Sequence, residues 1–218
     1  MMYSIALGIS IALSFIANIF FIAGMVGYST DVDTFKAVPW LRIDEDNIDI
    51  YFGLQSYSTS SDTSTNGCTD CSIKYSDCSG STCNNCDDDG KVAFSFLVVA
   101  SFATACVIGF GTPMFVSYGY GKHIVTTFMS SLAAVSSLIS LAVFMGDCYE
   151  RLQDDLDDSG SSAELRWGPG SLVVILGVLV MWTVAVFHAA SCCFSQGESN
   201  SPTQLQQSSM ADSREIVL

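Results

Sequence analysis

Cysteine is the residue type in this chain whose number and spacing could support chemistry. Five of the nine cysteines lie in one polar segment in the first half of the chain, and Cys148 follows much later. Two pairs have the spacing Cys-x2-Cys, namely Cys68 with Cys71 and Cys83 with Cys86. Such pairs can form disulfides, exchange thiols with a substrate or bind zinc through four thiolates. Which of these applies depends on the residues around them.

A redox enzyme would need one of these cysteines as a reactive thiolate. A thiolate is stabilised by a nearby cation or helix N-terminus, but the neighbours here are Asp70, Asp77 and the acidic run Asp87-Asp88-Asp89. Carboxylates disfavour a further negative charge beside them. We therefore predict a non-enzymatic protein with no catalytic residue and no cofactor, with a membrane thiol-disulfide oxidoreductase as the alternative.

A four-cysteine zinc loop facing the cytoplasm is the second alternative. The two pairs are eleven residues apart, whereas paired zinc sites are separated by about 15–20 residues, and Cys78 would be left over. In an oxidising compartment, six cysteines form an even set that can close three disulfides. We predict disulfides and no metal, with these candidates: Cys68, Cys71, Cys78, Cys83, Cys86 and Cys148.

Four long apolar runs must position these cysteines. They cover residues 4–27, 92–115, 124–146 and 171–190, and none contains Asp, Glu, Lys or Arg. About 20 residues of helix cross a hydrocarbon core about 30 Å thick, so each run is long enough. The sequence therefore predicts an all-α membrane protein, with a four-transmembrane-helix bundle in a single domain over residues 1–194.

Polar residues within the runs predict how the helices pack. Ser10, Ser14 and Asn18 are spaced four apart on one face of the first run, and such residues share hydrogen bonds with neighbouring helices. His188 is the only Asp, Glu, Lys, Arg or His residue within the four runs. Because ionisable residues mark transport pathways in membranes, their scarcity argues against transport through the bundle of a single copy.

The runs place two polar loops, residues 28–91 and 147–170, on one side of the membrane and both termini on the other. The net charge is −14, and these loops hold 12 and seven of the 22 acidic residues. An acidic surface repels phosphate groups. We therefore predict membrane lipids and other membrane proteins as partners, and no nucleic acid.

Two signals disagree about which side is outside. The even set of loop cysteines favours extracellular loops, cytoplasmic termini and a location in the plasma membrane. The loops also hold six of the eight Lys and Arg residues, and the positive-inside rule would place such loops in the cytoplasm. We predict extracellular loops, against the orientation that the Lys and Arg count indicates.

The C-terminal residues predict two kinds of attachment. Cys192 and Cys193 follow the last apolar run, where juxtamembrane cysteines are candidates for S-palmitoylation. Residues 195–218 are rich in Ser and Gln without apolar periodicity, which predicts a disordered cytoplasmic tail. The tail ends with Ile216 and Leu218 on either side of a valine, a pattern that suits capture by a PDZ-type scaffold.

The first half of the loop at residues 28–91 differs from its cysteine-rich second half. Residues 48–54 alternate between apolar and polar side chains, and with residues 38–43 they predict two short strands. Along the loop stand, in this order, Trp40, Gly53, Leu54, Cys68 with Cys78, and Lys91.

This order of residues resembles the motif of the claudin and peripheral myelin protein superfamily. That motif is Trp, then Gly-Leu-Trp, then two cysteines, with a basic residue just before the second span. A large first loop and a short link between the second and third spans are similar as well. The chain departs from the motif at Gln55, which stands in place of the second Trp, and at Cys68, which lies 14 residues past Leu54.

The resemblance implies a left-handed four-helix bundle with a small extracellular antiparallel sheet, and Trp40 packed between the two. It implies a non-enzymatic role in protein–protein contact through disulfide-stapled outer loops. Adhesion or barrier assembly between cells, and an auxiliary subunit beside a channel or membrane complex, are both known in that superfamily. The partners would then be further copies of this chain or a channel.

Overall fold

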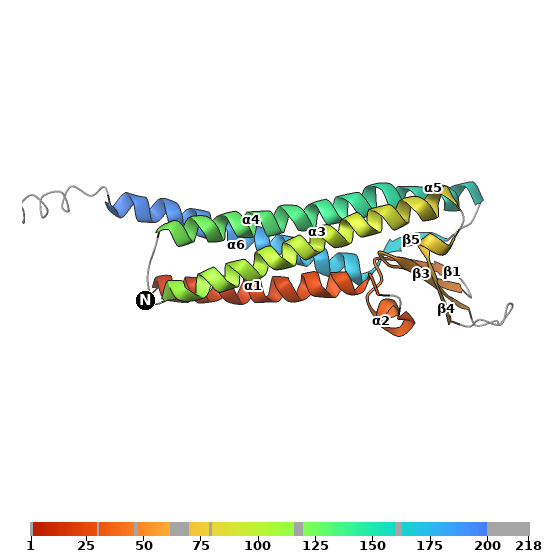
Figure 1. The fold of residues 1–218 in the computed structure, drawn as a ribbon, viewed down its shortest axis with the longest axis horizontal. Coiled ribbons are helices and arrows are strands. Elements are labelled where there is room, and N and C mark those ends of the chain that lie inside the picture. Colours follow the sequence, from red (N-terminus) through yellow and green to blue (C-terminus); the bar gives the residue numbers. More distant parts are fainter. Residues whose placement is uncertain are drawn as a thin grey trace, which may run out of the picture.

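The computed structural model describes residues 2–29, 31–45, 48–61, 70–78, 80–115, 120–159 and 163–199. It contains four long helices, which are α1 (Met2–Val26), α3 (Ser81–Gly111), α4 (Tyr120–Val143) and α6 (Pro169–Ser199). Each is long and apolar enough to cross a membrane, which suggests an integral membrane protein. The helices run along the long axis of the molecule, and a sheet lies at one end (Figure 1). The prediction of four long apolar helices is confirmed.

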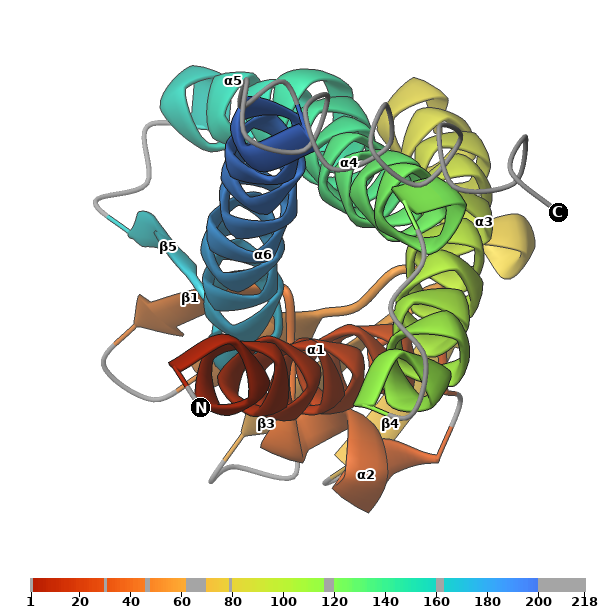
Figure 2. The same cartoon turned by 90° about the vertical axis from the view of Figure 1, so that its left-hand side faces the viewer.

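Seen along the bundle, the helices form a ring in the order α1, α3, α4, α6, and each contacts two neighbours (Figure 2). Hydrogen bonds join the ring. The Ser101 hydroxyl donates to Asn18 Oδ1 at 2.6 Å, and Ser10 Oγ shares a hydrogen bond of 2.8 Å with His188 Nε2. Ser10 and Asn18 therefore bond to neighbouring helices as predicted. Ser14 instead donates to the Ser10 carbonyl oxygen within its own helix.

Three helices extend beyond the predicted apolar runs. α3 begins eleven residues before the run at 92–115 and ends in the short helix η2 (Thr112–Phe115), while α4 continues through the π-helical turn η3 (Phe144–Tyr149) into α5 (Glu150–Ser159). Apolar composition identifies only the length of a helix that could cross a membrane. Beyond that length, the polar start of α3 packs against η3, the continuation of α4. α6 continues to Ser199, five residues into the predicted tail; residues 200–218 lie outside the described part of the chain.

The sheet has five antiparallel strands in the order β4-β3-β2-β1-β5. The strand predicted at residues 48–54 is present as the central strand, and the one predicted at 38–43 begins three residues later, at Leu41. The register pairs Leu41 with Phe52 on one side and with Trp167 on the other. The strand β5 comes from the second loop, so the sheet joins the two loops. The strand bounds are β1 (Leu41–Glu45), β2 (Ile48–Phe52), β3 (Ser56–Ser61), β4 (Asp70–Lys74) and β5 (Glu164–Trp167).

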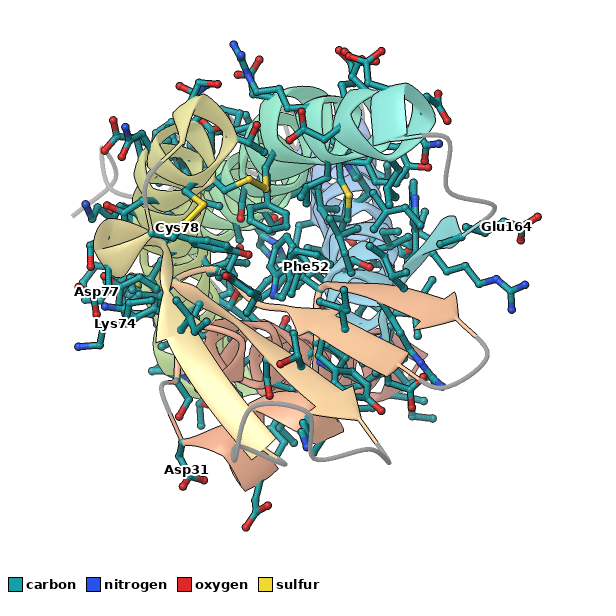
Figure 3. The ribbon with its side chains drawn as sticks, turned by 90° about the vertical axis from the view of Figure 1, so that its right-hand side faces the viewer. Asp31, Phe52, Lys74, Asp77, Cys78 and Glu164 are labelled. Atoms are coloured by element: carbon teal, nitrogen blue, oxygen red, sulfur yellow. A yellow bond between two sulfur atoms is a disulfide. The ribbon has the colours of Figure 1, made fainter. Side chains whose placement is uncertain are left out.

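The two faces of the sheet differ in polarity. Leu41, Ile43 and Phe52 are buried on the face toward the helices, and Phe52 points into the space between sheet and bundle (Figure 3). Arg42 and Arg166 are exposed on the opposite face, which the short helix α2 (Val32–Ala37) partly covers. A last short helix, η1 (Tyr75–Asp77), connects the sheet to the start of α3.

Candidate functional site: the head and its disulfides

The head is defined here as the described part of residues 28–91 and 147–170, and a buried disulfide joins its two loops. Cys86 in α3 and Cys148 in η3 are bonded, with a Cα–Cα distance of 4.8 Å and a sequence separation of 62. Both are fully buried. The predicted pairing of the first loop with Cys148 in the second is therefore present in the structure.

A second disulfide joins Cys78, just after η1, to Cys83 in the first turn of α3, with a Cα–Cα distance of 6.1 Å. Cys83 and Cys86 are therefore each bonded elsewhere and not to each other, although their Cys-x2-Cys spacing suggested one unit. In this state neither offers a free thiol for exchange or a thiolate for zinc. Cys68 and the side chain of Cys71 lie outside the described residues.

Trp40 fixes the start of the sheet to the bundle. Its side chain is fully buried, its indole N–H donates to the Gly24 carbonyl oxygen of α1 at 2.9 Å, and its ring meets Phe144 of η3 edge-on at 5.2 Å. Its own carbonyl oxygen accepts from the Gly168 N–H at 2.8 Å, at the entry to α6. Trp40 thus lies between sheet and bundle, as the resemblance implied.

The Gly53-Leu54 pair joins the end of β2 to the helices. The Leu54 N–H donates to the Gly27 carbonyl oxygen at 2.7 Å, and Gly53 donates to Ser56 at 2.9 Å. Gly90 of α3 lies directly against the Leu54 carbonyl, where a Cβ atom would overlap the oxygen. The sequence did not identify Gly90 as a contact residue. The only sign of it was its position four residues after Cys86, which places the two one helical turn apart on α3.

Tyr75 is a second buried anchor that the sequence reasoning missed. Its hydroxyl donates to the Gly53 carbonyl oxygen at 3.1 Å, and its ring continues a stack with Phe52 and Tyr57 at centroid distances of 6.0 Å. Burial raises the pKa of the Tyr75 phenol well above its usual range, and the nearby Tyr57 adds to the shift. The phenol therefore stays protonated and keeps this hydrogen bond.

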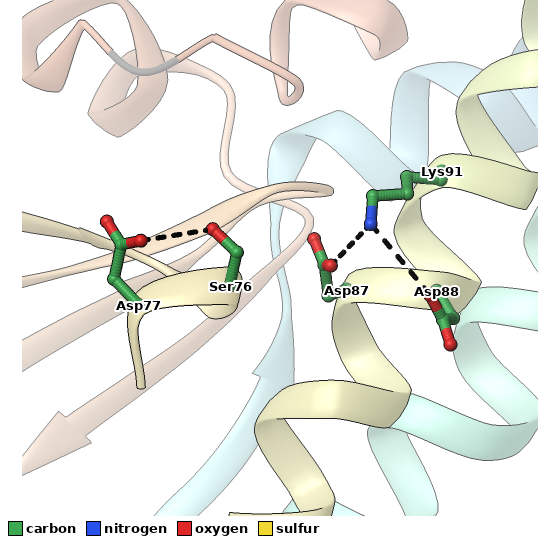
Figure 4. A network of polar contacts seen from close by, with 5 residues as sticks. All are labelled: Ser76, Asp77, Asp87, Asp88 and Lys91. Atoms are coloured by element: carbon green, nitrogen blue, oxygen red, sulfur yellow. Dashed lines mark hydrogen bonds and ion pairs between the residues drawn. The ribbon is translucent and has the colours of Figure 1, made fainter. Parts of the chain in front are cut away.

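Lys91, the basic residue of the motif, contacts the carboxylates of Asp87 and Asp88 on its own helix (Figure 4). In η1 the Ser76 hydroxyl donates to Asp77 at 3.3 Å, and the same figure draws this contact. Lys91 is half exposed, and salt bridges at such positions contribute about 0–1 kcal/mol. The contact therefore orders the surface of α3 more than it stabilises the fold.

The exposed surface of the head carries charges of both signs on the sheet and mainly acidic ones on α5. On the outer face of the sheet, Lys36 and Arg42 lie over the Tyr51 ring at 5.9 and 5.6 Å, and the Tyr51 hydroxyl donates to Asp49 at 3.3 Å. Partial burial raises the pKa of Tyr51, and Asp49 adds to the shift. The helix α5, on the other side of the head, exposes five acidic side chains: Glu150, Asp154, Asp155, Asp157 and Asp158.

Two sets of candidate residues fall elsewhere. Cys192 and Cys193 lie on α6, but their side chains are outside the described part, and Ile216 and Leu218 lie outside it altogether. Among the residues that the structure describes, no group of three or more His, Cys, Asp and Glu side chains could hold a metal ion. No protein-family model and no curated protein matches the chain.

Proposed function

We propose that this is a non-enzymatic integral membrane protein whose head makes protein–protein contacts, in claudin-like adhesion or barrier assembly or as an auxiliary subunit of a membrane complex or channel. One observation carries the proposal. The buried Cys86–Cys148 bond fixes the two loops of the head to each other at the top of α3 and η3, so the head is a preformed platform.

A preformed platform suits binding, because a surface that is already ordered loses little conformational entropy when a partner binds. The head is held at three further points besides the disulfide. Trp40 anchors β1, Leu54 anchors the end of β2, and Tyr75 anchors the turn before α3. The anchors lie under the sheet, which leaves its outer face and the helix α5 available for contact.

The acidic helix α5 is the surface that we assign to partner contact. Leu152 and Leu156 pack toward the hydrophobic core, while the acidic side chains of α5 face outward. Such a surface attracts basic partners and raises the rate of encounter with them. The partner is a further copy of this chain or another membrane protein that presents a basic surface.

The orientation belongs to the same proposal. Disulfides persist in an oxidising compartment, which supports an extracellular head and cytoplasmic termini at the plasma membrane. Palmitoyl groups on Cys192 and Cys193 and a PDZ-type scaffold at Ile216–Leu218 would then act on the cytoplasmic side. Nucleic acid has no part in this function.

Affinity purification in mild detergent after cell-surface crosslinking tests the proposal. The variant D154N/D157N/D158N removes three charges from α5 and leaves Asp155, whose carboxylate accepts from the Thr82 hydroxyl at 2.8 Å. The matched control E198Q/D212N/E215Q removes three charges from the C-terminal residues. We expect crosslinked complexes of the wild type and the control, and at least a fivefold loss for the α5 variant. A crosslinked species made of this chain alone indicates self-assembly, and a heteromeric one indicates the auxiliary role.

The contact role is wrong if the wild type stays monomeric throughout, or if alkylation of the intact cell surface labels Cys83 or Cys86 rapidly. The second result would show reactive thiols in place of the disulfides and would favour the oxidoreductase.

A further inference from the structure

A groove lies between α4 and α6 at the end of the bundle farthest from the sheet (Figure 1). It has a volume of about 460 Å³ and is lined by side chains of both helices, which are Ile124, Thr127, Phe128, Ser131 and Ala189. Phe128 is 62% exposed and Ile124 48%, so the groove opens to the outside of the bundle, which is lipid in a membrane. The Thr127 hydroxyl donates within α4 at 2.8 Å, so the walls of the groove are mainly apolar.

The direction and chemistry of the groove fit a hydrocarbon chain. Its α4 wall runs from Ile124 to Ser131, which is about 10 Å along a helix that rises about 1.5 Å per residue. Ile124 begins the apolar run at residues 124–146, so the groove starts at the membrane boundary and runs inward. None of its described lining residues is charged, and a charged ligand would lose its hydration there without a partner. An unbranched acyl chain has no such cost.

The last turns of α6 bring a cysteine position to the groove. Position 193 follows Ala189 by four residues within α6, and residues four apart share a face of a helix. Position 192 follows His188 by four residues instead, and His188 is 1% exposed inside the bundle. By its place along the helix, Cys193 is therefore on the groove face of α6, and Cys192 is on the face toward the bundle interior.

We propose that a palmitoyl chain attached to Cys193, rather than one attached to Cys192, lies in the groove between α4 and α6. The inference rests on the cytoplasmic C-terminus proposed above. The donor is a long-chain acyl-coenzyme A thioester. The Cys193 sulfur attacks its carbonyl carbon, the bond from this carbon to the coenzyme A sulfur breaks, and the coenzyme A thiolate takes the cysteine proton.

Chains of the surrounding lipids compete for the same groove. Some chain must fill it, because the lining atoms of an empty groove lose their dispersion contacts. The chain on Cys193 begins one helical turn from Ala189, so its binding is intramolecular and its effective concentration at the groove is raised. From there it runs past Phe128 toward Ser131, which is the direction in which the groove enters the membrane.

A second groove provides the matched control. It has a volume of about 240 Å³, lies between α1 and α6 at the same end of the bundle, and is lined by Ala6, Leu13 and Phe187 among others. One turn past Phe187 stands Ser191, which offers no thiol. A chain on Cys193 therefore has one groove on its own face of α6, and the α1 groove should stay without it.

Photocrosslinking of the full chain in cells tests the inference. Cells are fed a palmitate analogue that carries an alkyne and a diazirine, and crosslinked peptides are identified by mass spectrometry after irradiation. We expect peptides covering residues 120–131 to be joined to the Cys193 peptide, about fivefold or more above peptides of α1. C193S should lose these crosslinks and C192S should keep them. S131W fills the groove and should reduce them about fivefold while Cys193 stays acylated, whereas A6W, in the α1 groove, should leave them unchanged.

The possible contrary results are distinct. A wild type without an acyl group on Cys193 overturns the inference, and so does an acylated Cys193 that crosslinks only to lipid or to α1. If C193S keeps the crosslinks at residues 120–131, a chain of a bilayer lipid occupies the groove instead. Should S131W not fold, the wild type and C193S decide alone. None of these results depends on whether the head binds a partner, so the inference and the contact role of the head fail separately.

Discussion

The indole nitrogen of Trp40, at the start of the sheet, donates a hydrogen bond of 2.9 Å to the carbonyl oxygen of Gly24 in α1. Fifteen residues separate the two, and the bond ties the start of the first strand to the first helix. The Phe144 ring packs edge-on against the Trp40 indole, so α1, η3 and the sheet meet at Trp40. This one side chain therefore couples the head to the bundle.

Substituting Trp40 tests this coupling. Trp40→Ala leaves a cavity between sheet and helices and should lower the free energy of unfolding by about 3–5 kcal/mol. Trp40→Phe keeps most of the ring and loses the hydrogen bond to Gly24, which should lower it by about 1 kcal/mol. Trp167→Phe is the control, since Trp167 is half exposed. Thermal unfolding in detergent measures all three, and equal effects of W40A and W167F would contradict the anchoring role.

Gly90 and Gly109 form a matched pair on the same helix α3. A Cβ at Gly90 would overlap the carbonyl of Leu54, whereas a Cβ at Gly109 meets no atom within 4 Å. Gly90→Ala should therefore push β2 away from α3 and destabilise the head by several kcal/mol, as overpacking against backbone does. Gly109→Ala should be neutral or slightly stabilising. Melting curves of the two variants provide the measurement, and similar melting temperatures would refute the close approach.

The two disulfides should differ in their contribution to stability. Closing a loop restricts the unfolded chain more when the loop is longer, so Cys86–Cys148, with a sequence separation of 62, should contribute about 4 kcal/mol. Cys78–Cys83, with a separation of 5, should contribute about 2 kcal/mol. The double serine variants of each pair are compared with Cys106→Ser, which removes a free cysteine of the described part of the chain.

Non-reducing peptide mass spectrometry checks the pairing itself. We expect fragments that join Cys86 to Cys148 and Cys78 to Cys83. A Cys83–Cys86 link would mean that the Cys-x2-Cys pair is a unit after all, and the redox alternative would gain support.

The sequence predicted those helices and strands whose own residues carry a clear apolar pattern. The apolar runs located the four helices, and the alternation at residues 48–54 located β2. β3 (Ser56–Ser61) has no such alternation and forms because β2 and β4 pair with its backbone on both sides. Its sequence of serines, one tyrosine and one threonine is equally compatible with a loop.

The same distinction holds for the candidate site. The count of cysteines predicted that Cys148 would pair with the first loop, but only the packing of α3 against η3 selects Cys86 as its partner. The meeting of His123 with His188 depends on α4 beginning before its apolar run and on the ring order of the helices. Neither contact is encoded within a short window of sequence.

Tyr75 should make the stability of the head fall at alkaline pH. Its phenol is buried and its pKa is raised in the folded state, while in the unfolded chain it loses its proton near pH 10. The unfolded state therefore binds fewer protons above pH 10, and stability should fall by about 1.4 kcal/mol per pH unit from this group. Tyr75→Phe removes the hydrogen bond to Gly53, which should cost about 1 kcal/mol of stability at pH 7. Because the variant has no phenol at this position, its stability should not fall at alkaline pH for this reason. Melting temperatures of the two proteins should therefore converge and then cross between pH 9 and pH 11, and parallel curves would show that the Tyr75 hydroxyl reaches water.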